Sequence, residues 1–486
     1  MSTDKETLYK QTMTQAKGTR GELTRRTMLQ TSAALAAGAA VTSNLKEARA
    51  AGADTNGPGW YTDDSLTGKV TCITFSGQRW GLPPAACIPT FLERFPNVEM
   101  ELIDEPVGEG YTKIQMRAAS KSSSYNTAIA DSNQWTAIGG MDAMESFVPV
   151  MDADPGYNAD YLADVPQNIL NGYNLPQTKD GEIFGLSCDG NCKLGYYRRD
   201  KFEQAGITKA PETWEEAIDA CKAIHNPDND EYAFVSTGRR GLYAGLELYA
   251  VIRSLGGDWF DGGPLLNRPG NYEPQFDTEI GHASMDILLR IMEYRHPVTL
   301  NAADDEANQA LANGTALYAP MEWGTSILTD PEFTEFADVF ETEICPKGTS
   351  SAFPDSDHRP LMGGFAFYVN KSGNDKAAAF EWVKHLNAGD YTDSRIGEAY
   401  CTNTGQPARI SLLDKWSSHQ PYFQGLKKSF AKGTPGFPWV PETFTLADLV
   451  GNEVTAAIVG EKNPDDALKA MDDGCRQVMA DSGYYD

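Results

Sequence analysis

The sequence predicts an α/β fold divided into two lobes, and two observations support this prediction. Short apolar runs of strand length alternate with helical segments along the chain, which is the pattern of a parallel α/β sheet. The chain of 486 residues is also longer than one hydrophobic core supports, because such cores stop growing at about 250 to 300 residues. With 41% hydrophobic and 10% aromatic residues, the chain has enough apolar side chains to fill two cores.

The first 50 residues are predicted to be an export signal rather than part of the fold. Arg25-Arg26 precede an Ala-rich run over residues 31–41. This run is too short and too weakly apolar to cross a bilayer, because a membrane-spanning helix needs about 20 apolar residues. Ala48-Arg49-Ala50 follows with the small-x-small pattern that a signal peptidase cuts. We therefore expect an exported protein with a signal peptide at residues 1–50.

The signal segment resembles a twin-arginine signal, with two departures from the usual pattern. Met28 and Gln30 stand where that family more often has Phe and Lys. The twin-arginine route and the general export route therefore both stay open. Residues 51–68 begin with a stretch rich in Gly, Asp and Pro, and we expect them to form a flexible N-terminal segment.

The chain is strongly acidic, with a formal net charge of −27 at pH 7. This charge repels phosphate backbones and anionic lipid headgroups, so nucleic acids and membrane surfaces are poor partners. It also disfavours strongly anionic ligands. The composition therefore favours a soluble protein whose partner is not a polyanion.

The eight cysteines and six histidines show no metal-ligand spacing. Cys188 and Cys192 form a C-x3-C pair rather than the C-x2-C repeats of zinc ribbons, and the histidines form no H-x3-H or H-E-x2-H pattern. We therefore expect no metal site and no cofactor. Cys221 and Cys475 fall on apolar helical stripes and are predicted to be buried free thiols. Disulfides are permitted in an exported protein, and their connectivity stays open.

The first part of the chain alternates strands with helices. Residues 70–75 form a nearly continuous apolar run of strand length, and the helical segment that follows ends near Phe95. Apolar residues alternate over 98–102, which indicates a second strand. A helix over 111–119 and a third, buried strand over 127–130 complete this part. Such alternation favours a parallel sheet.

The rest of the chain contains more helices and then returns to an α/β layer. Thr213 and Glu216 form a capping box at the start of one predicted helix, and another helix stops at Gly256-Gly257. Residues 310–318 are predicted to form a helix, a turn and a strand. Further predicted elements are a strand near 181–186, a helix after 195–200, helices through 285–292 and 380–386, a strand at 363–369 and a last helix from Pro464 to Val478.

Several motifs, taken in their order along the chain, resemble those of one family. They are Ser76-Gly77-x-x-Trp80, YYRRDKFEQAGI at 196–207, APETWEEA at 210–217, NGTAL at 313–317, GGF at 363–365 and ALKAMDDGCRQVM at 467–479. Over about residues 69–479, the chain is similar to extracellular solute-binding proteins (family 1) of carbohydrate-type ABC importers.

The resemblance implies the two-lobe fold of periplasmic binding proteins, in which the chain crosses between the lobes three times and the ligand lies in the cleft. On this sequence, lobe one would cover residues 60–187 and 364–414, and lobe two residues 190–362 and 418–486. The resemblance also implies a periplasmic monomer that delivers a sugar or polyol to ABC permease subunits in the inner membrane.

Aromatic residues at loop positions suit the binding of a neutral sugar, because the C–H face of a sugar packs on aromatic rings. Trp80, Trp135, Trp259 and Trp323 each follow a strand or a glycine turn, and parallel sheets bind ligands at the carboxyl ends of their strands. We expect Trp135 and Trp323 to be the main stacking platforms. The resemblance supports Trp323 and adds Tyr243 as another aromatic residue of the cleft.

Polar residues near these aromatics are candidates for binding the hydroxyl groups of a sugar. Glu322 is expected either to accept hydrogen bonds from hydroxyls or to face solvent. Gly363 and Gly364 allow a close backbone approach or a hinge at a lobe crossing. The full set of polar and glycine candidates is Gln78 with its neighbour Arg79, Asp131, Asn133 with its neighbour Gln134, Asp189, Asn191, Glu322, Gly364 and Arg409, the last of which aligns with a basic loop position in relatives.

The expected mechanism is capture of the ligand by closure of two lobes, without bond cleavage. The main alternative is an exported enzyme, either a glycoside hydrolase or an oxidoreductase exported by the twin-arginine route. Against it, the sequence contains no G-x-G-x-x-G after the first strand, no G-x-S-x-G and no C-x2-C-H. A third alternative is a passive structural protein of the cell envelope, for which no ligand would raise the unfolding temperature.

Overall fold

The computed structural model describes residues 66–77, 79–132, 134–173, 183–262, 272–349, 351–438 and 440–485, all within one folded unit that spans residues 56–486. The predicted signal peptide lies outside the described residues, as does most of the predicted flexible segment. Two predicted site residues, Gln78 and Asn133, also lie outside them.

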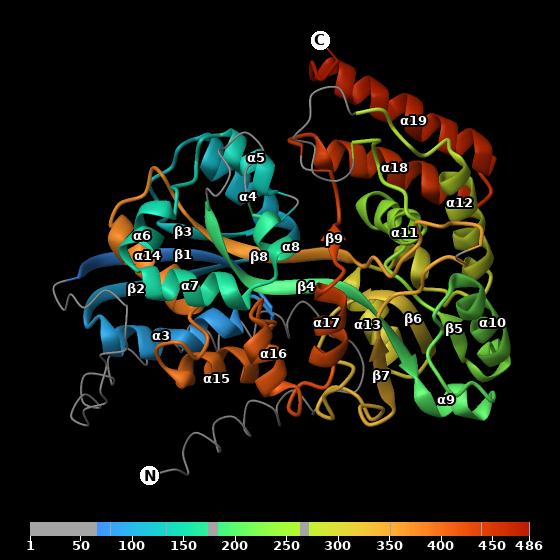
Figure 1. The fold of residues 1–486 in the computed structure, drawn as a ribbon, viewed down its shortest axis with the longest axis horizontal. Coiled ribbons are helices and arrows are strands. Elements are labelled where there is room, and N and C mark those ends of the chain that lie inside the picture. The colour runs from blue at the N-terminus through green and yellow to red at the C-terminus, as the bar shows by residue number, and fades with distance from the viewer. Residues whose placement is uncertain are drawn as a thin grey trace. The chain divides into compact units, whose positions relative to one another are not determined.

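The strands of the described residues form one mixed sheet, shown in Figure 1. Its strand order is β2-β1-β3-β8-β4-β6-β5, with β7 paired to β4 and β9 paired to β8. The strands are β1 (Thr67–Phe75), β2 (Asn97–Glu105), β3 (Thr127–Asp131), β4 (Gly185–Arg198), β5 (Tyr232–Phe234), β6 (Ala316–Trp323), β7 (Phe340–Glu343), β8 (Leu361–Val369) and β9 (Thr434–Pro435).

The predicted parallel pairing holds for part of this sheet. β1 pairs in parallel with β2 and β3, and β5 pairs in parallel with β6. By contrast, β8 lies antiparallel between β3 and β4, and β4 is antiparallel to β6 and β7. A purely parallel sheet is therefore wrong, because strands that return from distant parts of the chain enter the sheet in the opposite direction.

The helices follow the strands in chain order. Before β4 they are α3 (Leu82–Arg94), α4 (Val107–Ala119), α5 (Trp135–Gly140), α6 (Val148–Ala153), α7 (Pro155–Asp164) and α8 (Gln167–Asn171). Between β4 and β8 they are α9 (Arg199–Gln204), α10 (Trp214–Ile224), α11 (Leu242–Ser254), α12 (Glu279–Met292) and α13 (Asp304–Ala312), with short 3-10 helices at Pro227–Asn229 and Thr299–Asn301. After β8 they are α14 (Lys376–Leu386), α15 (Ser394–Thr402), α16 (Ile410–Trp416), α17 (Phe423–Phe430), α18 (Thr443–Ile458) and α19 (Pro464–Asp481).

Local sequence explains where these helices begin. The predicted capping box is present in α10: the Thr213 hydroxyl accepts from the Glu216 amide at 3.2 Å, and the Glu216 carboxylate accepts from the Thr213 amide at 3.2 Å. Pro464 opens α19 as predicted, after the Asn463 side chain accepts from the Asp465 amide at 2.9 Å. These contacts satisfy amides that would otherwise lack partners at a helix start.

Two hydrophobic cores lie on either side of the central strands. One core surrounds β1, β3 and β8 and extends along β4 to α13 and β6, and the other lies among α10, α11, α12, α18 and α19. In Figure 1 these helices stand on the right and β1 to β3 on the left, with β4 running between them. Phe423, Leu426 and Phe430 of α17 belong to the first core, and Phe437 belongs to the second.

β4 and β8 connect the two cores. The first half of β4 pairs with β8, from Gly185 opposite Tyr368 to Cys192 opposite Met362, and its second half pairs with β6 and β7. The register of β4 shifts between Ser187 and Asp189. Because β4 and β8 are hydrogen-bonded to each other, the chain passes between the cores as a paired ribbon rather than as separate loops.

All eight cysteines are buried and free, including Cys221 and Cys475 as predicted. Burial raises the pKa of their thiols, for example to about 12 for Cys72 and Cys87. The thiols are therefore protonated at neutral pH and behave as small apolar side chains.

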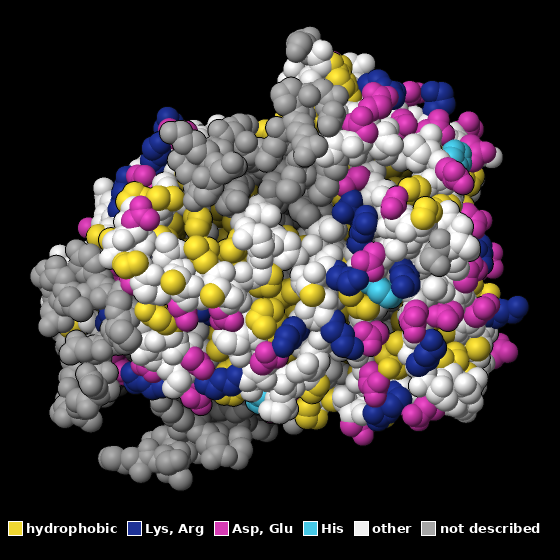
Figure 2. All heavy atoms as spheres, viewed as in Figure 1, with side chains coloured by type: hydrophobic (Ala, Val, Ile, Leu, Met, Phe, Trp, Pro, Cys, Tyr) yellow, Lys and Arg dark blue, Asp and Glu magenta, His cyan; other side chains and the backbone are white. Residues whose placement is uncertain are grey.

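Charged side chains gather on one half of the face shown in Figure 2. On the face shown in Figure 2, Asp and Glu mix with Lys and Arg over the half that holds α12 and α19. Exposed ion pairs there include Arg290 with Glu215 at 2.6 Å and Lys469 with Asp473 at 2.7 Å. Within the described residues, no helix has the length and apolar character needed to cross a membrane.

Candidate functional site

Arg79, directly after β1, is held between aromatic rings and a buried carboxylate. Its Nε and Nη2 atoms donate to the two carboxylate oxygens of Asp189, at 2.6 and 2.8 Å. Its guanidinium lies 5.1 Å from the ring centre of Trp80 and 5.7 Å from that of Phe365. Burial raises the pKa of Asp189, and Arg79 opposes this shift. The bidentate pair fixes the loop after β1 onto β4.

A second charged pair lies beneath Trp323, at the end of β6. The Lys193 ammonium donates to Glu247 Oε1 at 2.5 Å and to the Met321 carbonyl at 3.3 Å, and it lies 5.5 Å from the Trp323 ring centre. The Thr237 hydroxyl donates to the same oxygen of Glu247 at 2.9 Å. Lys193 is fully buried, so the pair is shielded from solvent.

Glu322 and Asp304 contribute carboxylates whose charge is not fully compensated. Glu322 is fully buried; its Oε1 accepts from the Trp323 amide at 2.8 Å, and its Oε2 has no hydrogen-bond partner among the described residues. Burial raises the pKa of Glu322 to about 8, although Lys193 opposes the shift. Asp304, the first residue of α13, has an unpartnered Oδ1 in the same described part, and burial raises its pKa to about 6.

Elements of both cores meet around these charges. Tyr111 of α4 donates to Asp131 at the end of β3 at 3.4 Å. Tyr243, at the start of α11, lies beneath the Arg239 guanidinium, which is 4.8 Å from its ring centre. The pKa of Tyr111 is raised well above 10, first by burial and then by Asp131, Tyr243 and Asp304. Tyr111 therefore interacts electrostatically with Asp131, on its own side of the molecule, and with Tyr243 and Asp304, on the other side.

Glycines of β8 allow the close approach of this site's backbone and rings. A Cβ at Gly364, whose φ is +105°, would lie 2.3 Å from the Asp189 carbonyl oxygen. A Cβ at Gly363 would lie 2.8 Å from the Trp323 ring. Opposite them in β4, the Asn191 side chain accepts from the Gly324 amide at 3.0 Å. The glycines are therefore required by packing, and Asn191 holds the turn that follows Trp323.

The structure brings most of the predicted site residues into this region. They are Trp80, Asp131, Asp189, Asn191, Tyr243, Glu322, Trp323 and Gly364. Their contact with a ligand remains a prediction.

Trp135 and Trp259 have core positions instead, which corrects their assignment as ligand-facing rings. Trp135 is fully buried, with the rings of Tyr173 and Tyr368 at 5.1 and 6.2 Å. Trp259 is also fully buried, with the rings of Tyr249 and Phe276 at 5.4 and 5.1 Å. Neither indole has an exposed face on which a sugar can stack, because aromatic neighbours already cover it.

Arg409 also has a structural role in this conformation. Its Nε donates to the Asn387 carbonyl at 2.7 Å, and its Nη1 pairs with Asp160 at 2.7 Å and Asp164 at 3.2 Å. These bonds tie the segment before α16 to α7 and to the end of α14. Arg409 thus stabilises the first core and lies apart from the charges around Trp323.

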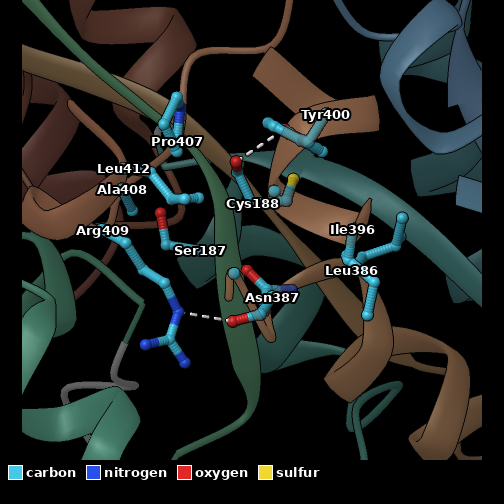
Figure 3. A pocket seen from close by; sticks show the side chains of 12 residues that line it. Ser187, Cys188, Leu386, Asn387, Ile396, Tyr400, Pro407, Ala408, Arg409 and Leu412 are labelled. Carbon is cyan, nitrogen blue, oxygen red and sulfur yellow. Dashed lines mark hydrogen bonds between the residues drawn. The ribbon is translucent and has the colours of Figure 1, made fainter. Parts of the chain in front are cut away.

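A small pocket beside Arg409 is shown in Figure 3. Its lining includes Ser187, Cys188, Tyr400 and Leu412, and the Tyr400 hydroxyl donates to the Cys188 carbonyl at 2.6 Å. The lining is mostly apolar and shares no residue with the region around Trp323. Among the described residues, no group of His, Cys, Asp and Glu has the arrangement of a metal site.

Comparison with known proteins identifies the family. The bacterial extracellular solute-binding protein family matches residues 84–388 of the chain. This chain belongs to that family. A mannitol-binding protein of Pseudomonas aeruginosa is 22% identical over 355 residues, which cover 68% of this chain and 76% of the relative.

Solved structures of other solute-binding proteins share the fold. The protein from Agrobacterium radiobacter K84 in complex with ribitol has a TM-score of 0.69 at 18% identity and covers 85% of this chain and 99% of its own. The protein from Agrobacterium vitis S4 with bound D-mannitol has a TM-score of 0.70 at 19% identity, with coverage of 85% and 99%. The predicted α/β, two-lobe binding-protein fold is therefore confirmed.

Some charged residues of this solute-binding protein's site were not predicted from the sequence. Lys193, Glu247 and Asp304 are among them. A signal was nevertheless present for Glu247, because it is the only charged residue in the apolar segment LYAGLELYAVI at 242–252. Lone charges in such segments are buried only when paired.

Proposed function

We propose that this protein is the periplasmic sugar- or polyol-binding component of an ABC importer. The ligand would lie between the two cores, with its C–H face on Trp323 and its hydroxyls on the charged residues around Arg79 and Glu322. Closure of the lobes would bury it, and the closed form would dock on permease subunits as a monomer.

One observation carries this proposal: buried polar atoms without hydrogen-bond partners in the described part of the chain gather around Arg79. They are Trp80 Nε1, Glu322 Oε2 and Asp304 Oδ1. Arg79 interacts electrostatically with Asp304 and Tyr422, and Asp304 interacts with Glu322. Buried atoms without partners also occur elsewhere, for example Trp135 Nε1 and Trp259 Nε1, but around Arg79 they lie beside buried charges, where a polar ligand would satisfy them.

The family and the named relatives support this assignment over an enzyme. The family consists of solute-binding proteins, and the relatives above are named for mannitol or were crystallised with ribitol and D-mannitol. Polyols of this type offer several hydroxyls, each able to donate and accept hydrogen bonds. They match a site that presents both carboxylates and an indole N–H.

The lobes would be hinged at β4 and β8, where the paired ribbon passes between the cores. We place the third crossing at residues 415–417, before α17, as the resemblance implies. Gly425 of α17 lies against Thr342 of β7 and Leu194 in the second half of β4, which supports this placement.

The test is a binding screen by thermal shift, followed by calorimetry, with D-mannitol, ribitol, maltose and monosaccharides. We expect at least one of them to raise the unfolding temperature and to bind with one-to-one stoichiometry and without product formation. Turnover of a model glycoside would favour the enzyme alternative. No shift with any carbohydrate or polyol would contradict the proposal.

A further inference from the structure

Carboxylates outnumber cations around Trp323, in a region that is largely buried except for the exposed Asp305 and Arg239. The carboxylates are those of Asp131, Asp189, Glu247, Asp304, Asp305 and Glu322, and the cations are Arg79, Lys193 and Arg239. These groups interact with one another electrostatically through Asp304, Tyr111 and Tyr243. The region therefore has an excess of negative charge when all its acids are ionised.

The cations there are already engaged. Arg79 forms its two hydrogen bonds with Asp189, at 2.6 and 2.8 Å. Lys193 donates to Glu247 and to the Met321 carbonyl, at 2.5 and 3.3 Å. The Arg239 guanidinium lies over the ring of Tyr243, 4.8 Å from its centre. Among the described residues, none of these three cations forms an ion pair with Glu322 or Asp304.

Glu322 and Asp304 present acceptors that lack donors. Glu322 is fully buried, and its Oε2 has no hydrogen-bond partner within the described ranges; the same holds for Asp304 Oδ1. Leaving a buried carboxylate without a cation or donor is costly, and such groups are normally paired. Without a ligand, burial keeps Glu322 mostly protonated at pH 7, because its pKa is raised to about 8. A bound molecule that supplies a positive charge and N–H donors favours the ionised carboxylate, so its binding releases this proton.

An ammonium group fits these acceptors better than a hydroxyl. It carries three donors, no acceptor and a full positive charge, whereas a hydroxyl carries one donor and no charge. A hydroxyl that donates to a carboxylate also makes a charge-assisted hydrogen bond, but only the ammonium adds a positive charge that neutralises the carboxylate. The acceptors stand beside Trp323, because Glu322 precedes it in β6 and accepts its amide N–H at 2.8 Å.

We propose that the preferred ligand is a sugar or polyol that bears a protonated amino group, which binds between Glu322 and Asp304. This inference rests on the proposed function, since it places a hydroxyl-rich ligand at the same site. It refines the neutral ligand expected from the sequence. A neutral polyol, whose hydroxyls donate to the same carboxylates, is the alternative that the experiment decides.

The experiment compares matched ligands by calorimetry at pH 7. One series is sorbitol, 1-amino-1-deoxysorbitol and its N-acetyl derivative; the other is glucose, glucosamine and N-acetylglucosamine. We expect the amino compound of at least one series to bind about 10- to 100-fold more tightly than its neutral parent, and N-acetylation to abolish the gain.

Variants test whether the two carboxylates cause the preference. Glu322→Gln keeps the shape of the side chain and removes its charge, so we expect the ratio of amino to neutral affinity to fall by about tenfold. Asp304→Asn serves as the second variant if Glu322→Gln does not fold. Glu381→Gln is the matched control, because Glu381 is also buried, with an Oε2 that lacks a partner in the described residues, but lies beside Lys384 in the first core. It should leave the ratio unchanged.

The outcomes separate this inference from the proposed function. Equal or weaker binding of both amino compounds, with clear binding of their neutral parents, overturns the inference and leaves the proposed function in place. An amino preference that persists in both Glu322→Gln and Asp304→Asn also overturns it. Failure of every hydroxylated ligand to bind overturns the proposed function itself.

Discussion

The backbone of Gly363 lies against the indole of Trp323. A Cβ added at position 363 would come within 2.8 Å of ring atom Cζ3 and 3.0 Å of Cη2. Real Cβ atoms do not approach other atoms so closely, and the indole is partly buried against the second core. The position of the Trp323 ring is therefore set by the absence of a side chain in the neighbouring strand β8.

Gly363→Ala should displace the Trp323 ring and weaken ligand binding by about tenfold, while the indole itself remains. Calorimetric titration with the best ligand of the screen measures this change. Gly140→Ala in α5 is the matched control, because its Cβ would meet nothing within 4 Å. Unchanged affinity in Gly363→Ala would mean that the ring does not contact the ligand.

Trp323→Ala should weaken ligand binding by about 1 to 3 kcal/mol with the fold intact, because a stacking face is lost without a large core cavity.

Trp259→Ala should instead destabilise the fold. Its indole is fully buried, so we expect the free energy of unfolding to fall by about 3 to 5 kcal/mol. Titration and urea unfolding of both variants check the contrast; a stable Trp259→Ala variant would contradict the core assignment.

Arg79→Ala should lower the free energy of unfolding by about 3 to 5 kcal/mol, because it leaves the buried Asp189 carboxylate without its partner. Removing both charges in Arg79→Ala/Asp189→Ala should cost less than Arg79→Ala alone. Urea unfolding of both single variants and the double variant measures the coupling. Additive effects of the two substitutions would show that the pair contributes no interaction.

The buried histidine of α14, His385, should make the protein sensitive to acid. Burial lowers its pKa from 6.5 to about 3, and its Nε2 lies 2.9 Å from the Thr90 hydroxyl. Between these values the unfolded chain binds a proton that the folded chain does not, so the free energy of unfolding falls as the pH is lowered through this window.

His385→Gln should therefore flatten the acid side of the stability curve. Urea unfolding between pH 4 and pH 7 measures the slope for wild type and variant, and the exposed His419 supplies the control variant His419→Gln. Equal slopes in wild type and His385→Gln would show that His385 is not the group responsible.

Local sequence patterns predicted the elements well and their pairing less well. Short apolar runs located β1 and β3, and a capping box with helical spacing located α10, because each of these signals depends on neighbours in the chain. The antiparallel place of β8 between β3 and β4 depends on residues far apart, such as Gly185 opposite Tyr368, and no short pattern encodes it. Distant pairing is therefore the part of the fold that the sequence left open.

Some residues of the candidate site were predicted from the sequence and others were not. Trp80 and Trp323 stand near the charged pairs, whereas Trp135, which follows a strand in a similar way, points into the core. Gly185 makes room for it, since a Cβ there would lie 2.4 Å from the Trp135 ring. Likewise, Lys193 and Glu247 are separated by 54 positions, so their pairing appears only in three dimensions.

The eight enclosed, unpaired cysteines have a consequence for the lifetime of the molecule outside the cytoplasm. An oxidant reaches them only in a chain that has opened, and eight reactive thiols in an open chain can join in roughly a hundred complete combinations. Each time the chain unfolds, its thiols can therefore form non-native disulfides that prevent refolding. The rate of unfolding, more than the equilibrium between states, then determines how long the protein survives.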